Sequence, residues 1–225
     1  MQTSSPPSER QKELYQLAES QGGYFTAKQA AALGYASNKR IYHVRAHNWI
    51  REHRGIYRLA LFPEPERPDL ILWWLWSRDR SDQPTGVFSH QTALSLHDLT
   101  DTNPAKLDLT VPKHFRRGVP IPKVLRLHYG DVAAEDRELI HGVPVTSAMR
   151  AILDVWTESS LPKPVLREAF REAIKRGNIT KTQVATSQQD AERASALTEI
   201  RKRTKGSPKE NTLPAPHSAL PLRNV

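Results

Sequence analysis

Residues 26–59 read TAKQAAALGYASNKRIYHVRAHNWIREHRGIYRL and contain two helix starts followed by strand-forming residues. Thr26 and Gln29 have the spacing of a capping box, which predicts the start of a short Ala-rich helix. Gly34 suits the positive φ that closes a helix, and Ser37 is a favourable N-cap for a second helix. Two helices so close together predict a helix-turn-helix.

The second helix of this pair is expected to be basic on one side. Ile41 and Val44 fall on one face and are expected to pack inward. Lys39, His43 and His47 recur at intervals of four on the opposite face, and the predicted helix contains no acidic residue. Because Lys and Arg can donate to guanine edges and to phosphates, this face is typical of a helix that lies in the major groove of DNA.

A β-hairpin is predicted directly after this helix, with strand-forming residues on both sides of Gly55. Between Asn38 and Arg58, six Lys or Arg residues oppose one acid, Glu52. A three-helix module with a solvated basic face is the alternative, but two adjoining basic elements favour a winged helix-turn-helix that binds double-stranded DNA. The expected DNA-binding residues are Ser37, Asn38, Lys39, Arg40, Tyr42, His43, His47, Arg51, His53, Arg54 and Arg58.

The composition of the 225-residue chain bounds its function further. A formal net charge of +9 favours polyanionic partners, without separating DNA from RNA or a membrane surface. The absence of cysteine excludes disulfides, thiol catalysis and cysteine metal sites. No apolar run has the length of a membrane span and the N-terminus lacks the pattern of a signal peptide, so we expect a cytoplasmic protein without membrane contact.

The remaining segments predict an α+β fold. Residues 1–7 are expected to be a disordered lead, 8–62 the winged helix-turn-helix, and 63–186 a mixed α/β second domain. Residues 187–225 are expected to be a mostly disordered basic tail, with some helix between Asp190 and Arg201. Prolines 63, 65 and 68 mark the linker between the two domains.

The second domain is expected to begin with a helix over Leu70–Trp76 that is apolar all round, which predicts that its tryptophans lie in the core between the two domains. Strands are then expected near 87–88, 107–111, 124–129 and 143–145. Helices are expected over 89–97, after Thr146 or Ser147, and over 164–175.

Several segments of the chain resemble a known family. The run GGYFTAKQAAALGYASNKRIYHVRAHNWIREHRGIYRL is similar to the N-terminal winged helix of the AbiEi antitoxins of type IV toxin-antitoxin and abortive-infection systems. The segments VFSHQTALSLHDL, LDLTVP and HGVPVTSAMRAILD are similar to the second domain of many members. The resemblance extends over roughly residues 10 to 180, and the order of the segments is more specific than any one of them.

The resemblance implies a transcriptional regulator that represses its own operon at an operator with repeated sites. It also implies an antitoxin, whose second domain counteracts a nucleotidyltransferase-like toxin without forming a stable complex with it. Two alternatives stay open: a nucleic-acid-processing enzyme with a basic second domain, which a buried acid cluster there would favour, and a regulator with no toxin. A downstream nucleotidyltransferase gene would support the antitoxin.

Other candidate sites are weaker. His90 and His97 lie two turns apart on one predicted helix, so capping and packing are favoured over metal binding. Glu172 and Lys175, the nearest match to a nuclease motif, fall in a predicted helix. We therefore predict no enzyme, metal or cofactor. The segment that follows the predicted strand 107–111 is basic and is expected to be mostly a loop. Two interpretations stand equally: a solvated loop, or a contact with phosphate or RNA through Lys113, Arg116, Arg117, Lys123 and Arg126.

Overall fold

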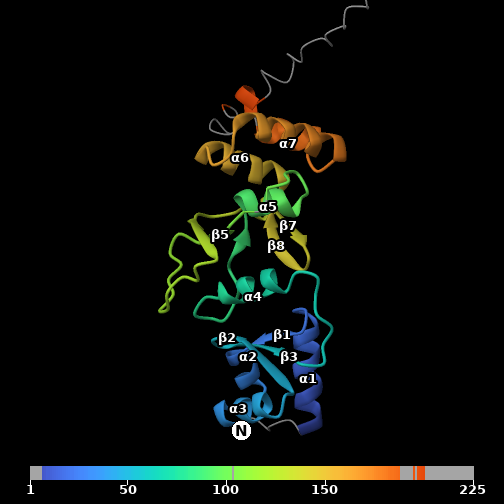
Figure 1. The fold of residues 1–225 in the computed structure, drawn as a ribbon, viewed down its shortest axis with the longest axis vertical. Coiled ribbons are helices and arrows are strands. Elements are labelled where there is room, and N and C mark those ends of the chain that lie inside the picture. The colour runs from blue at the N-terminus through green and yellow to red at the C-terminus, as the bar shows by residue number, and fades with distance from the viewer. Residues whose placement is uncertain (1–6, 103, 188–194, 196, 201–225) are drawn as a thin grey trace, which may run out of the picture.

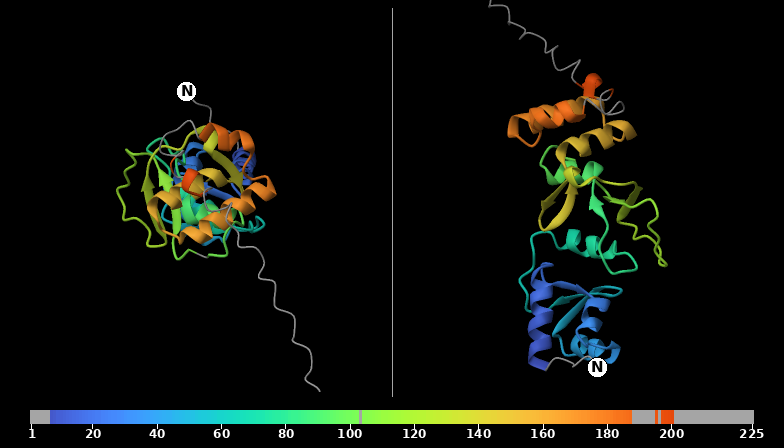
Figure 2. Two further views of the ribbon diagram at one scale, coloured as in Figure 1. Left: turned by 90° about the horizontal axis from the view of Figure 1, so that it is seen from above. Right: turned by 180° about the vertical axis from the view of Figure 1, so that it is seen from behind.

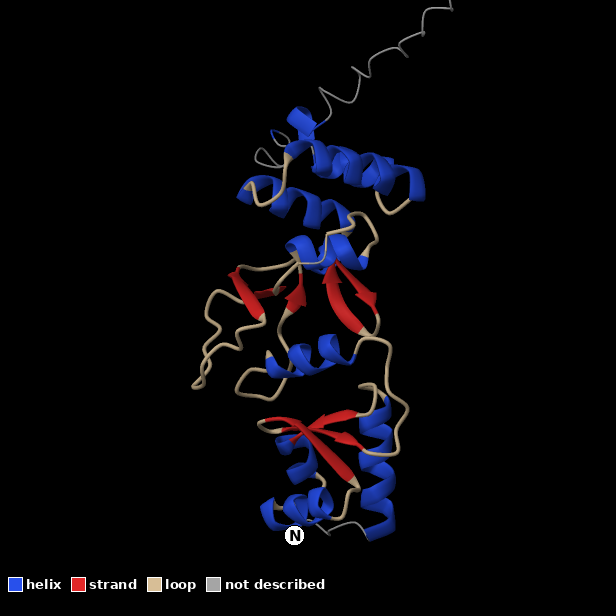
Figure 3. Ribbon diagram, viewed as in Figure 1, coloured by secondary structure: helices blue, strands red, loops and turns tan. Residues whose placement is uncertain are grey.

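The computed structural model describes residues 7–187 except 103, together with 195 and 197–200. It has a mixed α+β architecture with a three-stranded and a five-stranded sheet, which confirms the predicted α+β class (Figures 1 and 3). The two sheets follow one another along the longest axis, with helix α4 (Pro68–Trp76) between them (Figures 1 and 2). Most of the two segments predicted to be disordered, 1–7 and 187–225, lies outside the described residues, although α1 already begins at Pro7.

The N-terminal region contains three helices and one sheet. Its elements are α1 (Pro7–Glu19), β1 (Tyr24–Thr26), α2 (Ala27–Ala32), α3 (Ser37–Arg45), β2 (Trp49–His53) and β3 (Ile56–Leu59). The strands are antiparallel in the order β1-β3-β2. The capping box is confirmed, because the Thr26 hydroxyl accepts from the Gln29 amide while the Gln29 side chain accepts from the Thr26 amide. This element order is compatible with a winged helix-turn-helix.

Each face of the three-stranded sheet packs against different helices. Phe25, Trp49 and Tyr57 point to the side of α1, α2 and α3, where they join Leu14 and other residues in a small core. On the other face, Tyr24 and Ile56 belong to the larger core, which includes α4. Alternation along each strand produces this division, because successive side chains point to opposite faces.

The C-terminal region is built on the five-stranded sheet, in the order β6-β5-β4-β8-β7. The strands are β4 (Val87–Phe88), β5 (Leu107–Val111), β6 (Leu125–Tyr129), β7 (Arg137–Ile140) and β8 (Val143–Thr146). The helices are α4, α5 (His90–Leu96), α6 (Ala148–Glu158), α7 (Lys163–Arg176) and α8 (Lys181–Ser187), with a 3₁₀ turn, η1, at Ala134–Asp136. Parallel pairing joins β4 to β8 and β5 to β6, whereas β4–β5 and β7–β8 are antiparallel.

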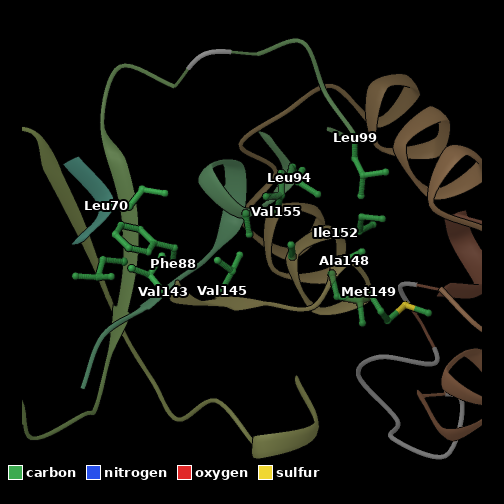
Figure 4. Close-up of a cluster of buried hydrophobic side chains, with 14 of the residues drawn as sticks. Leu70, Phe88, Leu94, Leu99, Val143, Val145, Ala148, Met149, Ile152 and Val155 are labelled. Carbon is green, nitrogen blue, oxygen red and sulfur yellow. The ribbon is translucent and has the colours of Figure 1, made fainter. Parts of the chain in front are cut away.

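Helix α4 connects the two sheets. Leu70 lies beside Phe88 and Val143 of the five-stranded sheet, while Leu94 and Ile152 occupy the side of α5 and α6 (Figure 4). Trp76 is fully buried, in agreement with the prediction that the apolar helix lies in a core. Because the same core includes Tyr24 and Ile56, it extends across the predicted boundary at residue 63.

Two features of the C-terminal region were not expected from the sequence. Strand β7 is an edge strand with mostly exposed side chains, so it lacks the alternation by which the other strands were recognised. In the segment predicted to be mostly disordered, residues 197–200 are helical, in agreement with the helix expected between Asp190 and Arg201, but the burial of Leu197 and Ile200 in the larger core was not expected. The larger core therefore includes two residues beyond residue 187.

Candidate nucleic-acid interface

Helix α3 lies at the end of the molecule away from the C-terminal region (Figure 1). Its solvent-facing surface carries Asn38, Ile41, Tyr42 and Arg45, all exposed and spaced as neighbours on one helical face. The prediction that Ile41 packs inward is wrong, because this side chain is 53% exposed. Val44, the other residue predicted to face inward, does pack against the small core.

His43 takes the inward position instead. Its ring stacks on Trp49 with centroids 4.5 Å apart and an angle of 14° between planes, and it meets the edge of Tyr35. Burial lowers the pKa of His43, so the neutral ring is favoured in this aromatic setting. Sequence reasoning placed His43 on the outer face because periodicity fixes only relative positions on a helix, whereas Trp49 fixes its absolute rotation.

Two other residues of α3 that were predicted to contact DNA donate hydrogen bonds to backbone carbonyl groups. Arg40 donates from Nη1 to the Tyr35 carbonyl at 2.9 Å, and Lys39 donates to the Gly34 carbonyl at 3.2 Å. The N-cap of α3 is Ala36, so the prediction of Ser37 as the cap is wrong. The Ser37 hydroxyl accepts from Arg40 Nη2 at 2.9 Å. His47, just after the helix, is exposed at φ 56°.

The predicted hairpin is confirmed, with a register shift between Arg51 and His53. Arg51 and Arg54 are exposed. Arg58 lies on the opposite face, where it pairs with Glu52 at 2.8 Å and its side chain is only 12% exposed. The hydrogen bond to Glu52 raises the pKa of Arg58. The three arginines therefore do not share one surface.

His53 faces the C-terminal region. Its ring meets the Trp73 ring of α4 edge-on, with centroids 5.5 Å apart. Burial is the main cause that lowers the pKa of His53, and neighbouring guanidinium groups lower it further. The sequence could not reveal this contact, because Trp73 lies twenty residues further along the chain.

The basic loop residues after β5 divide between solvent and protein. Lys113, Arg116 and Lys123 are exposed, and Lys113 approaches Asp131 at 3.9 Å. Arg117 lies over the Trp76 ring, 5.3 Å from its centroid, and Arg126 lies 3.4 Å from Asp108. These five cations consequently do not act as one patch.

A largely buried cluster joins two histidines of the C-terminal region, His90 and His128, to two acids. The Oε1 atom of Glu158 lies 3.3 Å from His90 Nε2 and 3.0 Å from His128 Nδ1. His128 Nε2 contacts Asp108 Oδ1 at 3.0 Å, and the Ser89 hydroxyl contacts His90 Nδ1 at 2.9 Å. His97, in contrast, bonds the Thr146 carbonyl, as the packing interpretation expected.

The two histidines of this cluster differ in protonation state. Both ring nitrogens of His128 face carboxylates, and both can donate only when the ring is an imidazolium. Burial opposes that charge, but hydrogen bonds and the negative charges of Asp108 and Glu158 outweigh it and raise the pKa of His128. Burial and the adjacent His128 lower the pKa of His90 to about 4, so one ring is charged and the other neutral.

The same atoms have the composition of a metal site, since His90, His128 and Glu158 offer ligand atoms within 4.8 Å of one another. However, the two imidazole rings stack with centroids 3.6 Å apart and planes only 12° from parallel. A metal ion must lie close to the plane of each ligating ring, and two nearly parallel planes share no such position. The observed geometry therefore fits a shared-proton cluster better than a metal centre.

Sequence reasoning did not connect these residues. Asp108 and His128 lie on neighbouring strands, and Glu158 ends α6. The alternation of β6, which places Arg126 and His128 on one face, was the only available signal. Glu172 and Lys175 do lie in a helix, where Glu172 pairs with Arg176 at 2.7 Å on the surface.

Comparison with known proteins supports the N-terminal assignment. Residues 12–60 match the family model described as transcriptional regulator, AbiEi antitoxin, which confirms the resemblance over the segment from α1 to β3. This family comprises regulators and antitoxins rather than enzymes. No curated protein matches the chain.

A solved structure shares the fold. The crystal structure of RV2827C protein from Mycobacterium tuberculosis aligns with a TM-score of 0.54 and 11% sequence identity, covering 89% of this chain and 78% of that one. At that identity the likeness concerns the fold alone. In the part of the chain that the structure describes, no helix has the length and hydropathy needed to cross a membrane.

Proposed function

We propose that this protein is a DNA-binding transcriptional regulator whose N-terminal region is a winged helix-turn-helix, with α3 as the recognition helix. One observation carries the proposal: the outer face of α3 presents Asn38, Ile41, Tyr42 and Arg45 to solvent at the end of the molecule. Large exposed apolar side chains beside polar ones are typical of a binding surface.

These four side chains suit base recognition. An Asn can bond an adenine through two hydrogen bonds, an Arg can bond a guanine in the same way, and apolar groups contact the thymine methyl. Exposed hairpin residues Arg51 and Arg54 would hold the phosphate backbone. In this proposal Asn38, Tyr42 and Arg45 specify the sequence, while the hairpin positions the protein.

We further propose that the protein is the antitoxin of a type IV toxin-antitoxin system. This rests on the family match over residues 12–60. The proposal includes repression of its own operon in the cytoplasm and neutralisation of a nucleotidyltransferase-like toxin without a stable complex. Residues 8–62 would bind DNA, and the region after residue 63 would provide the antitoxic function.

The test is binding to the DNA upstream of the protein's own gene, compared with a shuffled duplex. Tyr42→Ala should weaken binding to the upstream DNA without changing the thermal unfolding temperature. Tyr129→Ala is the matched control, because Tyr129 is a similarly exposed tyrosine in the C-terminal region. Equal binding of both variants and the unchanged protein would contradict the role of α3.

One observation favours the alternative of a nucleic-acid-processing enzyme. Asp108 is fully buried and its Oδ2 atom has no hydrogen-bond partner among the described residues, for which a catalytic role is one explanation. The adjacent imidazolium of His128 compensates its charge, and Glu158, 38% exposed, is the more accessible of the two acids. If Asp108 is catalytic, Asp108→Asn would abolish a nuclease activity of the folded protein, whereas if the cluster is structural the same change should lower the unfolding temperature.

A further inference from the structure

The hairpin bend contacts the loop after α4, which in turn contacts the loop after β5. The Gly55 carbonyl accepts from the Ala27 amide at 2.9 Å and from Arg78 Nη2 at 3.5 Å. Lys28 donates to the Arg80 carbonyl at 2.6 Å, and Arg117 donates to the Arg78 carbonyl at 3.1 Å. The start of α2, the hairpin bend, the loop after α4 and the loop after β5 are thus brought together at one junction.

Cations from both regions gather at this junction. Lys28 and Arg54 come from the N-terminal region, while Arg80 and Arg116 come from the two loops, and all four are exposed. Among the residues that the structure describes, none of the four has a carboxylate partner within 4 Å. A cavity of about 390 Å³ lies between the two loops, with Arg80, His114 and Arg116 in its lining.

The nearby acids make contacts within the protein, although Asp79 is exposed and also lines the cavity. Asp82 is buried, accepts from the Thr26 hydroxyl and pairs with Arg78 at 2.9 Å. Asp79 Oδ1 accepts from the amides of Ser81 and Gln83, which fixes the turn of the loop. The acids consequently stabilise the junction, while the cations remain exposed to solvent.

We propose that Lys28, Arg54, Arg80 and Arg116 form a second nucleic-acid contact that binds a phosphate backbone and is built jointly by the two regions. Guanidinium groups suit phosphates because their planar fork matches two oxygens. Among the described residues around the junction, the rings of Trp76 and Phe115 are buried and offer no surface on which a base could stack. The contact is therefore independent of sequence, unlike the outer face of α3.

The backbone could belong to DNA that flanks the operator or to a separate RNA strand, and the two sources are separable. The test uses the full-length chain in an α3 background that combines Asn38→Ala, Tyr42→Ala and Arg45→Ala, which removes the three residues proposed to read the DNA sequence. Binding of a random 30-base-pair duplex and of a 20-nucleotide single-stranded RNA is followed by fluorescence anisotropy at increasing salt. The junction variant combines Lys28→Ala, Arg80→Ala and Arg116→Ala, and leaves Arg54 in place because Arg54 is also assigned to the hairpin contact with the operator.

We expect this variant to bind at least about tenfold more weakly at low salt, with the slope of log K against log[salt] reduced by roughly two to three units for duplex or about two for single strands. A loss with RNA alone identifies RNA as the ligand, and a loss with duplex alone identifies DNA. The matched control replaces Lys106, Lys175 and Lys181 with Ala, which removes the same charge elsewhere on the surface.

Unchanged binding of both probes by the junction variant, or an equal loss in the control, would overturn the proposal. Arg116 Nη1 also donates to the Phe115 carbonyl, so a double variant of Lys28 and Arg80 tests the contact without disturbing that loop. This result is separate from the proposed function, since specific binding to upstream DNA depends on α3 and can survive when the junction contact fails.

Discussion

The two sheet regions differ in where they place their polar and aromatic groups. In the N-terminal region, Asn38, Tyr42 and Arg45 are exposed on α3. In the C-terminal region, Asp108 and His90 are buried. Asp108 contacts His128, and His90 contacts Glu158, which lies at the edge of the cluster. An exposed polar face can bind a ligand without a change in fold, whereas a buried ionised cluster changes stability whenever its charge changes.

The largest expected effect comes from separating the regions. A fragment of residues 1–62 should lose all ability to rescue cells from the toxin, if antitoxicity lies after residue 63. It should also unfold at a lower temperature than the full chain, because Tyr24 and Ile56 lose the cover of α4, at a cost of roughly 2 to 4 kcal/mol. Growth rescue by co-expression and thermal unfolding measure the two effects.

Rescue by the fragment at the level of the full chain would contradict this division of labour. DNA binding should persist at temperatures where the fragment is folded, which distinguishes loss of antitoxic function from loss of fold.

The next effect separates the two faces of α3. Replacing Asn38, Tyr42 and Arg45 with Ala should weaken binding to the upstream DNA by about 100-fold or more at an unchanged unfolding temperature, because each base contact contributes roughly 1 to 3 kcal/mol. Binding isotherms and thermal scans provide the measurement.

A companion variant changes the residues of α3 that the sequence alone predicted to face the DNA. Replacing Lys39, Arg40 and His43 with Ala should lower the unfolding temperature, since His43 covers Trp49 and Arg40 bonds the Tyr35 carbonyl. If this second variant instead lost DNA affinity at full stability, the assignment of the outer face would be wrong.

The buried cluster predicts opposite pH dependences for its two histidines. The folded pKa of His90, about 4, lies below its usual value of 6.5, so stability falls as the pH drops from about 6.5 towards 4. The pKa of His128 is raised, so its contribution is complete below pH 6.5 and is lost as the pH rises through the folded pKa. His90→Gln should flatten the acid limb by roughly 1 to 3 kcal/mol, and His128→Gln the limb above pH 6.5.

Urea unfolding from pH 4 to pH 9 checks both limbs. His114→Gln is the control, because His114 is exposed in the loop after β5. Equal pH profiles for all three variants would show that the cluster does not store a proton.

The smallest effect concerns the hairpin. Replacing Arg51 and Arg54 with Ala should reduce the slope of log K against log[salt] by roughly one to two units, at about 0.9 per phosphate contact. Arg58→Ala should leave the slope unchanged and lower stability slightly, because its partner is Glu52. Titrations of upstream and shuffled DNA at several salt concentrations measure this. A slope change with Arg58→Ala equal to that of the other arginines would restore the three-arginine interpretation.

The sequence by itself determined the local elements of this protein. The capping box of α2, the hairpin about Gly55, strands β5 and β8 and the buried helix α4 follow from spacing, turn chemistry and periodicity, which act between residues close along the chain. The basic character of residues 38–58, and with it the expectation of a nucleic-acid partner, is equally a property of the sequence.

Only the tertiary structure decided how these elements face one another. His43 packs on Trp49, which leaves Ile41 of the same helix exposed to solvent. Arg58 pairs with Glu52, and its side chain is therefore mostly buried. The cluster of His90, His128 and Glu158, and the hydrogen bond from Lys28 to the Arg80 carbonyl, join residues separated by up to 68 positions. Periodicity specifies a face of an element, but the partner that covers that face is chosen by packing between distant segments.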